Sequence, residues 1–474
     1  MTLPAKFVER VLRDLGGTEG AALCAALDAE PPVSVRLNPA KTGADTLPAG
    51  PDAGLPVPEA AGLPALAIAG RVPWSRDGRY LAVRPSFTLD PDFHAGAYYV
   101  QEASSQFVGH LLAAVRTEGA RILDLCAAPG GKTTLYASLA GPDGLVVANE
   151  IDRRRASVLA DNVRKWGTGN VAVTTCEPRA LGDFEAWFDV VAVDAPCSGE
   201  GMFRKDRDAR GEWSEGNVKQ CAARQDEILR EAWRALRPGG TLVYSTCTFN
   251  RDEDEGALER MAAWAGDEIA ESEETAVEDA WGIVCGRVGA FRTFRFYPHR
   301  TCGEGFFAAV ARKSFDAGGR VRAPKARRTV FAAVDRKTAG ELARWVRNPG
   351  GMHFAAVADT CYAWYAAQAD AVRTLSEALP VIYSGVALGQ VFKGVLKPDP
   401  ALAFFDGMNR GALPAAELDD EETLRFLRRQ DIAAGGLAEG MNLVCSRGRA
   451  LGFAKRIGAR VNNLYPSSLR IIKQ

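Results

Sequence analysis

The sequence has few of the residues that metal sites and disulfide frameworks require. Its 474 residues include only four histidines, and none of its ten cysteines belongs to a C-x-x-C pair. Zinc sites and disulfide scaffolds depend on such pairs or on clustered histidines. We therefore expect no bound metal, and we expect reduced thiols of the kind found in the cytoplasm.

Long hydrophobic runs and an excess of one charge are also missing. Met1 to Lys6 lead into a segment of mixed polarity, and no apolar run approaches the length of a membrane-spanning helix. We expect no membrane partner. The formal net charge is −1, so the whole molecule does not attract a polyanion. A nucleic-acid surface would have to be a local basic patch.

The length predicts several domains of ordinary globular composition, with 47% apolar and 25% charged residues. Residues 1–110 combine a helical stretch over 4–29 with short strands near 33–39, 80–83 and 98–100. This pattern predicts an N-terminal α/β accessory domain. Residues 42–66 are rich in Ala, Gly and Pro and predict a loop-rich connection.

From residue 111 to 313, short β-branched runs alternate with helical stretches. The expected strands cover 121–125, 145–149, 171–175, 190–193 and 241–245, and the expected helices cover 132–140, 153–166 and 218–236. A terminal hairpin is expected at 291–297 and 306–311. This alternation predicts a doubly wound α/β sheet, whose ligand site lies beyond the carboxyl ends of the parallel strands.

Two of these strands end in cysteine-containing turns. Asp194-Ala195-Pro196-Cys197 follows one strand, and Ser245-Thr246-Cys247 follows the next. The helix between them makes a strand–helix–strand unit that brings the two strands close together. Free cysteines are often buried core residues. These two, however, follow strand ends and are flanked by turn or hydroxyl residues, so we expect both thiols at one mouth of the sheet.

The first strand leads into a loop of small residues, Cys126-Ala127-Ala128-Pro129-Gly130-Gly131-Lys132-Thr133. A phosphate-binding P-loop would need glycine where Cys126 stands, although Asp194 could then serve as its magnesium-holding acid. The alternative is an adenosyl cofactor, with Glu150 at the end of the second strand as the acid that binds ribose hydroxyls. The missing P-loop glycine argues against a phosphate-binding loop. Together with the glycine-rich loop, the acid after the second strand and the terminal hairpin, it favours S-adenosylmethionine as the cofactor.

The last third of the chain contains two charge-segregated segments. Residues 314–330 form a linker that contains Arg320, Arg322, Lys325, Arg327 and Arg328. In the region 331–474, the acidic run 417–422 predicts a helix start. Residues 442–474 contain no Asp or Glu but hold Arg447, Arg449, Lys455, Arg456, Arg460, Arg470 and Lys473. They predict a basic surface for RNA or DNA, with a solvated face as the alternative.

The motifs around the two cysteines resemble the NOL/NOP/Sun family of RNA cytosine-5 methyltransferases, most closely its RsmF-type bacterial 16S rRNA enzymes. The resemblance rests on 194–205 and 238–248, and it extends to 98–102, 304–307 and 450–466. It implies a Rossmann-like core that depends on S-adenosylmethionine, with a PUA-like RNA-binding module at the C-terminal end.

The resemblance also implies a reaction, the methylation of carbon 5 of a cytosine in ribosomal RNA. Addition of a thiolate to carbon 6 makes carbon 5 nucleophilic. Cys247 is implied as that nucleophile, Cys197 as the residue that assists release, and Asp194 as the partner of the ring near nitrogen 3. Lys205 or Lys132 could lower a thiol pKa.

The implied cofactor contacts are Cys126, Ala127, Ala128, Pro129, Gly130, Gly131, Lys132, Glu150 and Asp194, with Glu177 as the acid at the adenine. The expected partner is ribosomal RNA or the small ribosomal subunit. Two alternatives stay open, a tRNA cytosine-5 methyltransferase and a non-catalytic RNA-binding protein of ribosome assembly.

Overall fold

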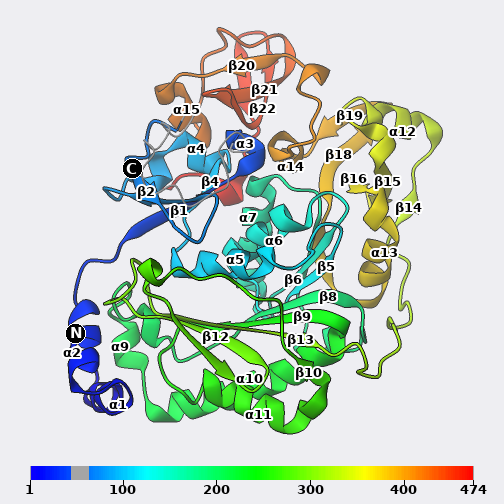
Figure 1. Cartoon of the computed structure of the whole chain (residues 1–474). Helices are drawn as coiled ribbons and strands as arrows, with labels where there is room; N and C mark the ends of the chain where they lie inside the picture. Colours follow the sequence, from blue (N-terminus) through cyan, green and yellow to red (C-terminus); the bar gives the residue numbers. More distant parts are fainter. Residues whose placement is uncertain (1, 44–62, 473–474) are drawn as a thin grey trace.

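The structure is a computed structural model that describes residues 2–43 and 63–472. Most of the loop-rich connection expected over 42–66 falls outside the described residues. The described part forms four β-sheets, of which the ten-stranded one lies at the centre of the fold (Figure 1).

The middle of the ten-stranded sheet is parallel. Its strands are β5 (Arg121–Asp124), β6 (Leu145–Asn149), β7 (Val171–Thr174), β8 (Phe188–Asp194) and β9 (Leu236–Thr246), in the order β7-β6-β5-β8-β9. All five strands expected from the sequence are confirmed. The chain leaves β5 in one direction through β6 and β7 and then returns to the other side of β5 as β8. This reversal between β5 and β8 is where α/β sheets bind ligands.

Antiparallel strands extend the sheet at both edges. The expected hairpin is confirmed as β12 (Phe291–Phe296) and β13 (Phe306–Lys313), with β13 next to β9. Short strands β10 (Ile269–Ala270) and β11 (Val284–Val288) add to this edge. At the opposite edge, β17 (Val381–Ser384) comes from the C-terminal third of the chain and pairs with β7. The sequence did not predict that strand.

Helices cover both faces of this sheet. One face carries α5 (Phe107–Ala113), α6 (Gly131–Ala140) and α7 (Arg153–Trp166), and the other carries α8 (Pro178–Gly182), α10 (Glu215–Ala235) and α11 (Glu255–Ala265) (Figure 1). Strand side chains alternate between the two faces. Ile122 therefore packs in one apolar cluster and Leu123 in the other. The helices expected at 132–140, 153–166 and 218–236 are confirmed.

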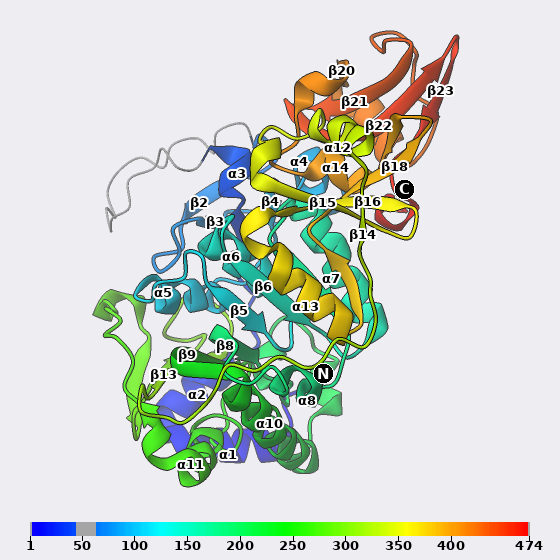
Figure 2. The ribbon, with the colours of Figure 1, turned by 90° about the vertical axis from the view of Figure 1, so that its right-hand side faces the viewer.

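The N-terminal residues pack in two separate places. Helices α1 (Ala5–Leu15) and α2 (Gly17–Ala26) lie beside the segment that follows β8, where the Phe7 and Phe203 ring centroids are 5.0 Å apart. The next segment forms a four-stranded sheet with two short helices, made of β1 (Val33–Leu37), α3 (Pro39–Thr42), β2 (Ile68–Arg71), β3 (Gly78–Leu81), α4 (Pro91–His94) and β4 (Tyr98–Tyr99). We call β1–β4 with α3 and α4 the small N-terminal sheet. It lies at the other end of the molecule from α1 and α2 (Figures 1 and 2).

The C-terminal third contains two antiparallel-rich sheets. The first consists of β14 (Ala332–Ala333), β15 (Met352–Val357), β16 (Thr360–Tyr365), β18 (Val386–Phe392) and β19 (Val395–Pro398). The second, the C-terminal sheet, consists of β20 (Ala415–Glu417), β21 (Gly440–Ser446), β22 (Arg449–Ile457) and β23 (Arg460–Asn463). Helices α12 (Arg336–Ala343), α13 (Ala369–Ala378), α14 (Pro400–Phe404) and α15 (Asp420–Leu427) accompany them. The helix start expected at 417–422 is confirmed, because the Asp419 side chain caps α15.

Candidate active site

Two cysteine loops meet where β8 and β9 end. Asp194, the last residue of β8, is paired with Ser245 of β9, so the residues that follow the two strands leave the sheet side by side. Cys247 is the first residue after β9, and Cys197 is the third after β8. The carboxyl ends of neighbouring parallel strands thus bring together residues that are 50 positions apart in the sequence.

The two sulfur atoms are 3.1 Å apart. The Cys247 backbone N–H also donates to the Cys197 sulfur at 3.4 Å. All ten cysteines, including these two, are free thiols. The hydrogen bond with Cys247, together with burial, raises the pKa of Cys197 well above its usual value. The contact with Cys247 and burial thus favour the protonated form of Cys197, and either sulfur can be the donor in the hydrogen bond between them.

Two buried glutamates hold these loops together. The Glu200 carboxylate accepts hydrogen bonds from the Thr248 hydroxyl at 2.8 Å and from the Phe249 backbone N–H at 3.0 Å. In the opposite direction, Glu253 accepts from the Ser198 backbone N–H at 2.9 Å. Each loop thus supplies a carboxylate that binds the other loop. Neither glutamate was selected from the sequence, because no local pattern indicates which side chains join the two loops.

A cavity of about 150 Å³ opens beside this edge of the sheet, above the loop that follows β5. Seven predicted residues line it, namely Cys126, Ala127, Ala128, Pro129, Gly131, Lys132 and Asp194. Gly130 forms the turn into α6 with φ +110°, and a Cβ there would lie 2.9 Å from the Leu159 Cδ1 atom. The positive φ therefore favours glycine at this position, while the Leu159 methyl belongs to a side chain that can move.

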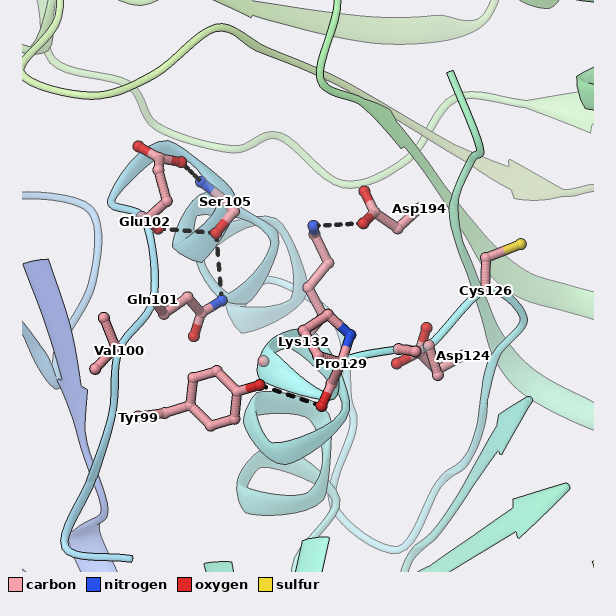
Figure 3. Close-up of a pocket in the computed structure, with 13 residues that line it drawn as sticks. Tyr99, Val100, Gln101, Glu102, Ser105, Asp124, Cys126, Pro129, Lys132 and Asp194 are labelled. Carbon is pink, nitrogen blue, oxygen red and sulfur yellow. Dashed lines mark hydrogen bonds and ion pairs between the residues drawn. The ribbon is translucent and has the colours of Figure 1, made fainter. Parts of the chain in front are cut away.

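Lys132 and Asp194 form the central ion pair of the cavity (Figure 3). The Lys132 Nζ atom lies 2.9 Å from the Asp194 carboxylate, whose other oxygen accepts from the Ser245 hydroxyl at 2.8 Å. Burial alone would lower the pKa of Lys132, but Asp194 and the neighbouring Cys247 and Asp124 leave it raised. The ammonium thus stays charged among the acids and close to Cys247.

Asp124, at the end of β5, is a cavity residue that the sequence analysis did not select. Its carboxylate is buried and accepts a hydrogen bond from the Thr133 hydroxyl at 2.6 Å. Burial raises its pKa to about 7. An acid that closes the first strand directly before a glycine-rich loop was visible in the sequence and could have pointed to it.

The opposite wall of the cavity comes from the segment around β4. Tyr99, Val100, Gln101, Glu102 and Ser105 line it (Figure 3). The Tyr99 hydroxyl donates to the Pro129 carbonyl at 3.2 Å, and Asn162 of α7 donates to the same carbonyl at 2.8 Å. This wall could not be predicted from the sequence, because its segment precedes β5 in the chain and reaches the cavity only through tertiary packing.

Six predicted residues are not part of the cavity lining: Gly130, the two cysteines Cys197 and Cys247, and the three residues Glu150, Glu177 and Lys205. Glu150 is buried at the end of β6 and pairs with Arg155 at 3.3 Å. Glu177 is exposed directly before α8. Lys205 is also exposed, and within the described part of the chain no hydrogen bond or ion pair joins it to either sulfur.

The groups that line the cavity suit an adenosyl cofactor. Its floor consists of small residues and a positive-φ glycine, which allow close approach to the backbone. Asp124, Glu150 and Asp194 end three neighbouring strands, so carboxylates are available at this edge for hydroxyl and ammonium groups.

The basic residues near the C-terminus have two different environments. Arg447 and Arg449 bind Asp92 of the small N-terminal sheet at 3.0 and 2.8 Å. Lys455, Arg460 and Arg470 are exposed, and Lys473 lies outside the described residues. Arg456 donates to the carbonyls of Ala434, Leu437 and Gly458. Part of the expected basic surface therefore joins two parts of the molecule instead of facing solvent.

Within residues 2–43 and 63–472, no group of three His, Cys, Asp or Glu side chains has the arrangement of a metal site. The described helices also include none whose length and apolarity would let it cross a membrane.

Three protein-family models match separate parts of this chain. Residues 111–312 match 16S rRNA methyltransferase RsmB/F, residues 3–103 match the N-terminal domain of 16S rRNA methyltransferase RsmF, and residues 414–471 match the methyltransferase RsmF PUA domain. The P-loop alternative has no support among these matches.

Curated relatives and solved structures agree with the models. The chain is 32% identical to ribosomal RNA small subunit methyltransferase F of Erwinia tasmaniensis over 421 residues, which cover 84% of each chain. It is 31% identical to the protein of that name from Shewanella loihica, over 84% of this chain and 83% of the relative.

Among solved structures, a methyltransferase homolog protein from Pyrococcus horikoshii is 26% identical with a TM-score of 0.52 and covers 66% of this chain and 100% of that one. NSun6 from Pyrococcus horikoshii, solved with SFG, shares the fold at 20% identity and a TM-score of 0.50, over 65% of this chain and 98% of that one. The resemblance seen in the sequence is confirmed: the chain belongs to the RsmF family of methyltransferases, whose methyl donor is S-adenosylmethionine.

Proposed function

We propose that this protein methylates carbon 5 of a cytosine in small-subunit (16S) ribosomal RNA. The observation that carries the proposal is the pair of free thiols, 3.1 Å apart, beside the cavity at the ends of β8 and β9. Addition of one sulfur to carbon 6 activates carbon 5. The adduct must later be broken, which gives a second thiol a task.

Cys247 is the proposed nucleophile. The Cys247 thiol gives its proton to water and its sulfur bonds to carbon 6, while the electron pair of the carbon 5–carbon 6 double bond makes carbon 5 nucleophilic. Bound S-adenosylmethionine would supply the methyl group to carbon 5 and would leave as the neutral thioether S-adenosylhomocysteine. The carbon 5 proton then passes to water, the double bond returns, and the carbon 6–sulfur bond breaks with its electrons going to sulfur.

Cys197 assists that release. Its raised pKa keeps it a thiol, so it donates a hydrogen bond to the Cys247 sulfur and stabilises the departing thiolate. Asp194, supported by Lys132 and Ser245, is proposed to hydrogen-bond the cytosine ring near nitrogen 3.

The residues proposed to hold the cofactor are the loop 126–132, Glu150 at the ribose and Glu177 at the adenine. Lys205, exposed near the cysteine loops, is retained only as a source of positive potential. A target cytosine within a duplex would have to be flipped out of the stack. The small N-terminal sheet and the exposed basic residues of the C-terminal sheet would then contact phosphates.

Incubation of the protein with 16S rRNA and S-adenosylmethionine tests the mechanism. On a denaturing gel, Cys197→Ala should retain a covalent protein–RNA complex, because release is impaired after addition. Cys247→Ala should form no complex and no product. Cys302→Ala, which removes an exposed thiol outside the site, should behave like the wild type.

Bisulfite mapping of rRNA and tRNA then identifies the substrate. We expect one 5-methylcytosine in 16S rRNA that is lost with Cys247→Ala. A modified tRNA instead would favour the tRNA alternative, and a Cys247→Ala protein that still supports ribosome assembly would favour the non-catalytic binder. Absence of an adduct with Cys197→Ala would overturn the division of labour between the thiols.

A further inference from the structure

A second cavity, of about 310 Å³, lies between the small N-terminal sheet and the C-terminal end of α7. We call it the α7 pocket. Its walls include the rings of Phe87, Phe93, Tyr98, Tyr99 and Trp166 together with the cations Arg84 and Lys165. We propose that the α7 pocket binds one unstacked nucleotide of the RNA substrate, outside the target cytosine. The inference rests on the RNA substrate proposed above.

Two cations line this pocket, and burial lowers the pKa of Lys165 to about 8 although the nearby Asp161 opposes that shift. The Lys165 ammonium lies 4.3 Å from the Phe93 ring centroid, and the Arg84 guanidinium lies 5.4 Å from that of Phe87. Among the residues that the structure describes, neither cation forms a salt bridge. Nearby Arg164, by contrast, is paired with Asp161 at 2.7 Å. Unpaired cations beside aromatic rings suit a ligand that carries both a phosphate and a base.

The walls of the α7 pocket are fixed relative to one another. The Lys41 ammonium donates to the carbonyls of Ala95 at 2.7 Å and Lys165 at 2.6 Å, which ties the small N-terminal sheet to the end of α7. Gly96 packs so close that a Cβ there would collide with the Lys165 carbonyl. The pocket therefore exists before a ligand arrives, which reduces the entropy lost on binding.

The α7 pocket adjoins the active-site cavity. Tyr99 and Val100 line both, and the Tyr99 hydroxyl binds Pro129 of the cofactor loop. An RNA strand that places its cytosine over Cys247 could therefore leave a neighbouring base on the aromatic wall. Single-stranded RNA is commonly held in this way, with bases stacked on aromatic side chains and phosphates on Lys or Arg.

RNA binding by the full-length protein at several salt concentrations tests the cations. Lys165→Gln and Arg84→Gln should each weaken binding of a 16S rRNA fragment about 3- to 10-fold and lower the slope of log K against log salt by about 0.7, the value for one lost single-strand phosphate contact. Lys165→Arg should restore the slope. Lys219→Gln, an exposed lysine on α10, should change neither quantity. Unchanged slopes in both pocket variants would overturn the proposal.

Photocrosslinking of RNA that contains 4-thiouridine tests the location without any methyl transfer. The wild type should crosslink within residues 87–100, and Lys165→Gln should lose that crosslink. Crosslinks confined to other segments, or occupancy by a peptide or a free mononucleotide without RNA, would contradict the proposal. Methylation that fails while this crosslink persists would count against the proposed reaction and not against the pocket.

Discussion

At the residue scale, Glu200 and Glu253 explain why two distant cysteines meet. Glu200 is 1% exposed and also accepts hydrogen bonds from the Trp213 indole at 2.9 Å and from Arg10 of α1. A buried carboxylate is stable only when such donors surround it. The N-terminal helix α1 therefore supports both cysteine loops through Arg10, which pairs with Glu200 and lies 4.0 Å from the Asp252 carboxylate.

Glu200→Gln tests how much this carboxylate contributes to the stability of the fold and to the reaction of Cys247. The amide keeps the size of the side chain but turns two hydrogens toward existing donors, so we expect a loss of about 1–3 kcal/mol in the free energy of unfolding. Adduct formation should also slow, because the loop with Cys247 loses its fixed contact with the loop of Cys197. Denaturant unfolding and the gel assay measure the two effects. Glu212→Gln, exposed on the nearby helix α9 (Ala209–Glu212), should alter neither.

Asp124 predicts a pH dependence of stability. An aspartate ionises near pH 4 in an unfolded chain, whereas burial raises the pKa of Asp124 to about 7. Between these values the folded protein binds more protons, so its free energy of unfolding should fall as the pH rises from 4 to 7. Denaturant titrations at several pH values should show a shallower fall for Asp124→Asn. An equal fall would contradict the assignment, and the exposed Asp267→Asn serves as the control.

At the element scale, the loop between β5 and α6 depends on Gly130. Its φ of +110° is a conformation that residues with a Cβ rarely adopt, and an added Cβ would also press on Leu159. Gly119 has φ +73° but open space around its Cβ position. Substitutions at these two glycines therefore distinguish the cost of backbone strain from the cost of a steric clash.

Gly119→Ala should cost only the strain, about 1–2 kcal/mol. Gly130→Ala should cost more and should also weaken the binding of S-adenosylmethionine, because the displaced loop forms the floor of the cavity. Denaturant unfolding and calorimetric titration with the cofactor test this. Equal losses of stability, with cofactor affinity unchanged in both, would show that the contact with Leu159 is easily relieved.

At the scale of the whole molecule, the two ends of the chain are joined through Asp92. This residue of α4 is fully buried and binds Arg447 and Arg449 of the C-terminal sheet. Apolar contacts accompany the ion pairs, since Ala95 packs in the same cluster as Phe426 and Leu451. The two parts expected to contact RNA thus form a continuous structure.

Asp92→Asn should loosen this junction. Removing one member of a buried ion pair costs about 3–5 kcal/mol, and Asp90 and Asp420, which also bind Arg447, should reduce that cost. We expect faster hydrogen exchange in α4 and β22, while the exchange of β5 and β8 stays unchanged. Asp420→Asn is the matched control, because Asp420 binds the same Arg447 at 2.9 Å but is exposed, and a surface pair contributes only about 0–1 kcal/mol. Similar effects of both variants would contradict the role of burial.

The sequence by itself determined the strands and helices of the parallel part of the central sheet. Three features are local signals in the sequence: the β-branched runs that become β5 to β9, the glycines of the loop 126–132, and the positions of Cys197 and Cys247 after strand ends. Parallel α/β topology then brings the residues that follow these strands to the same edge of the sheet. The RsmF-type motifs could be recognised for the same reason, since they are contiguous in the chain.

Only the tertiary structure decided how segments that are far apart in the sequence pack against one another. Tyr99 faces Pro129, β17 pairs with β7, and Arg447 binds Asp92 instead of solvent. None of these contacts has a local sequence signal, because each depends on the packing of segments tens to hundreds of residues apart. The burial of each charged side chain and its distance from opposite charges determine whether it is available to a substrate. Neither quantity can be read from the order of charged residues in the sequence.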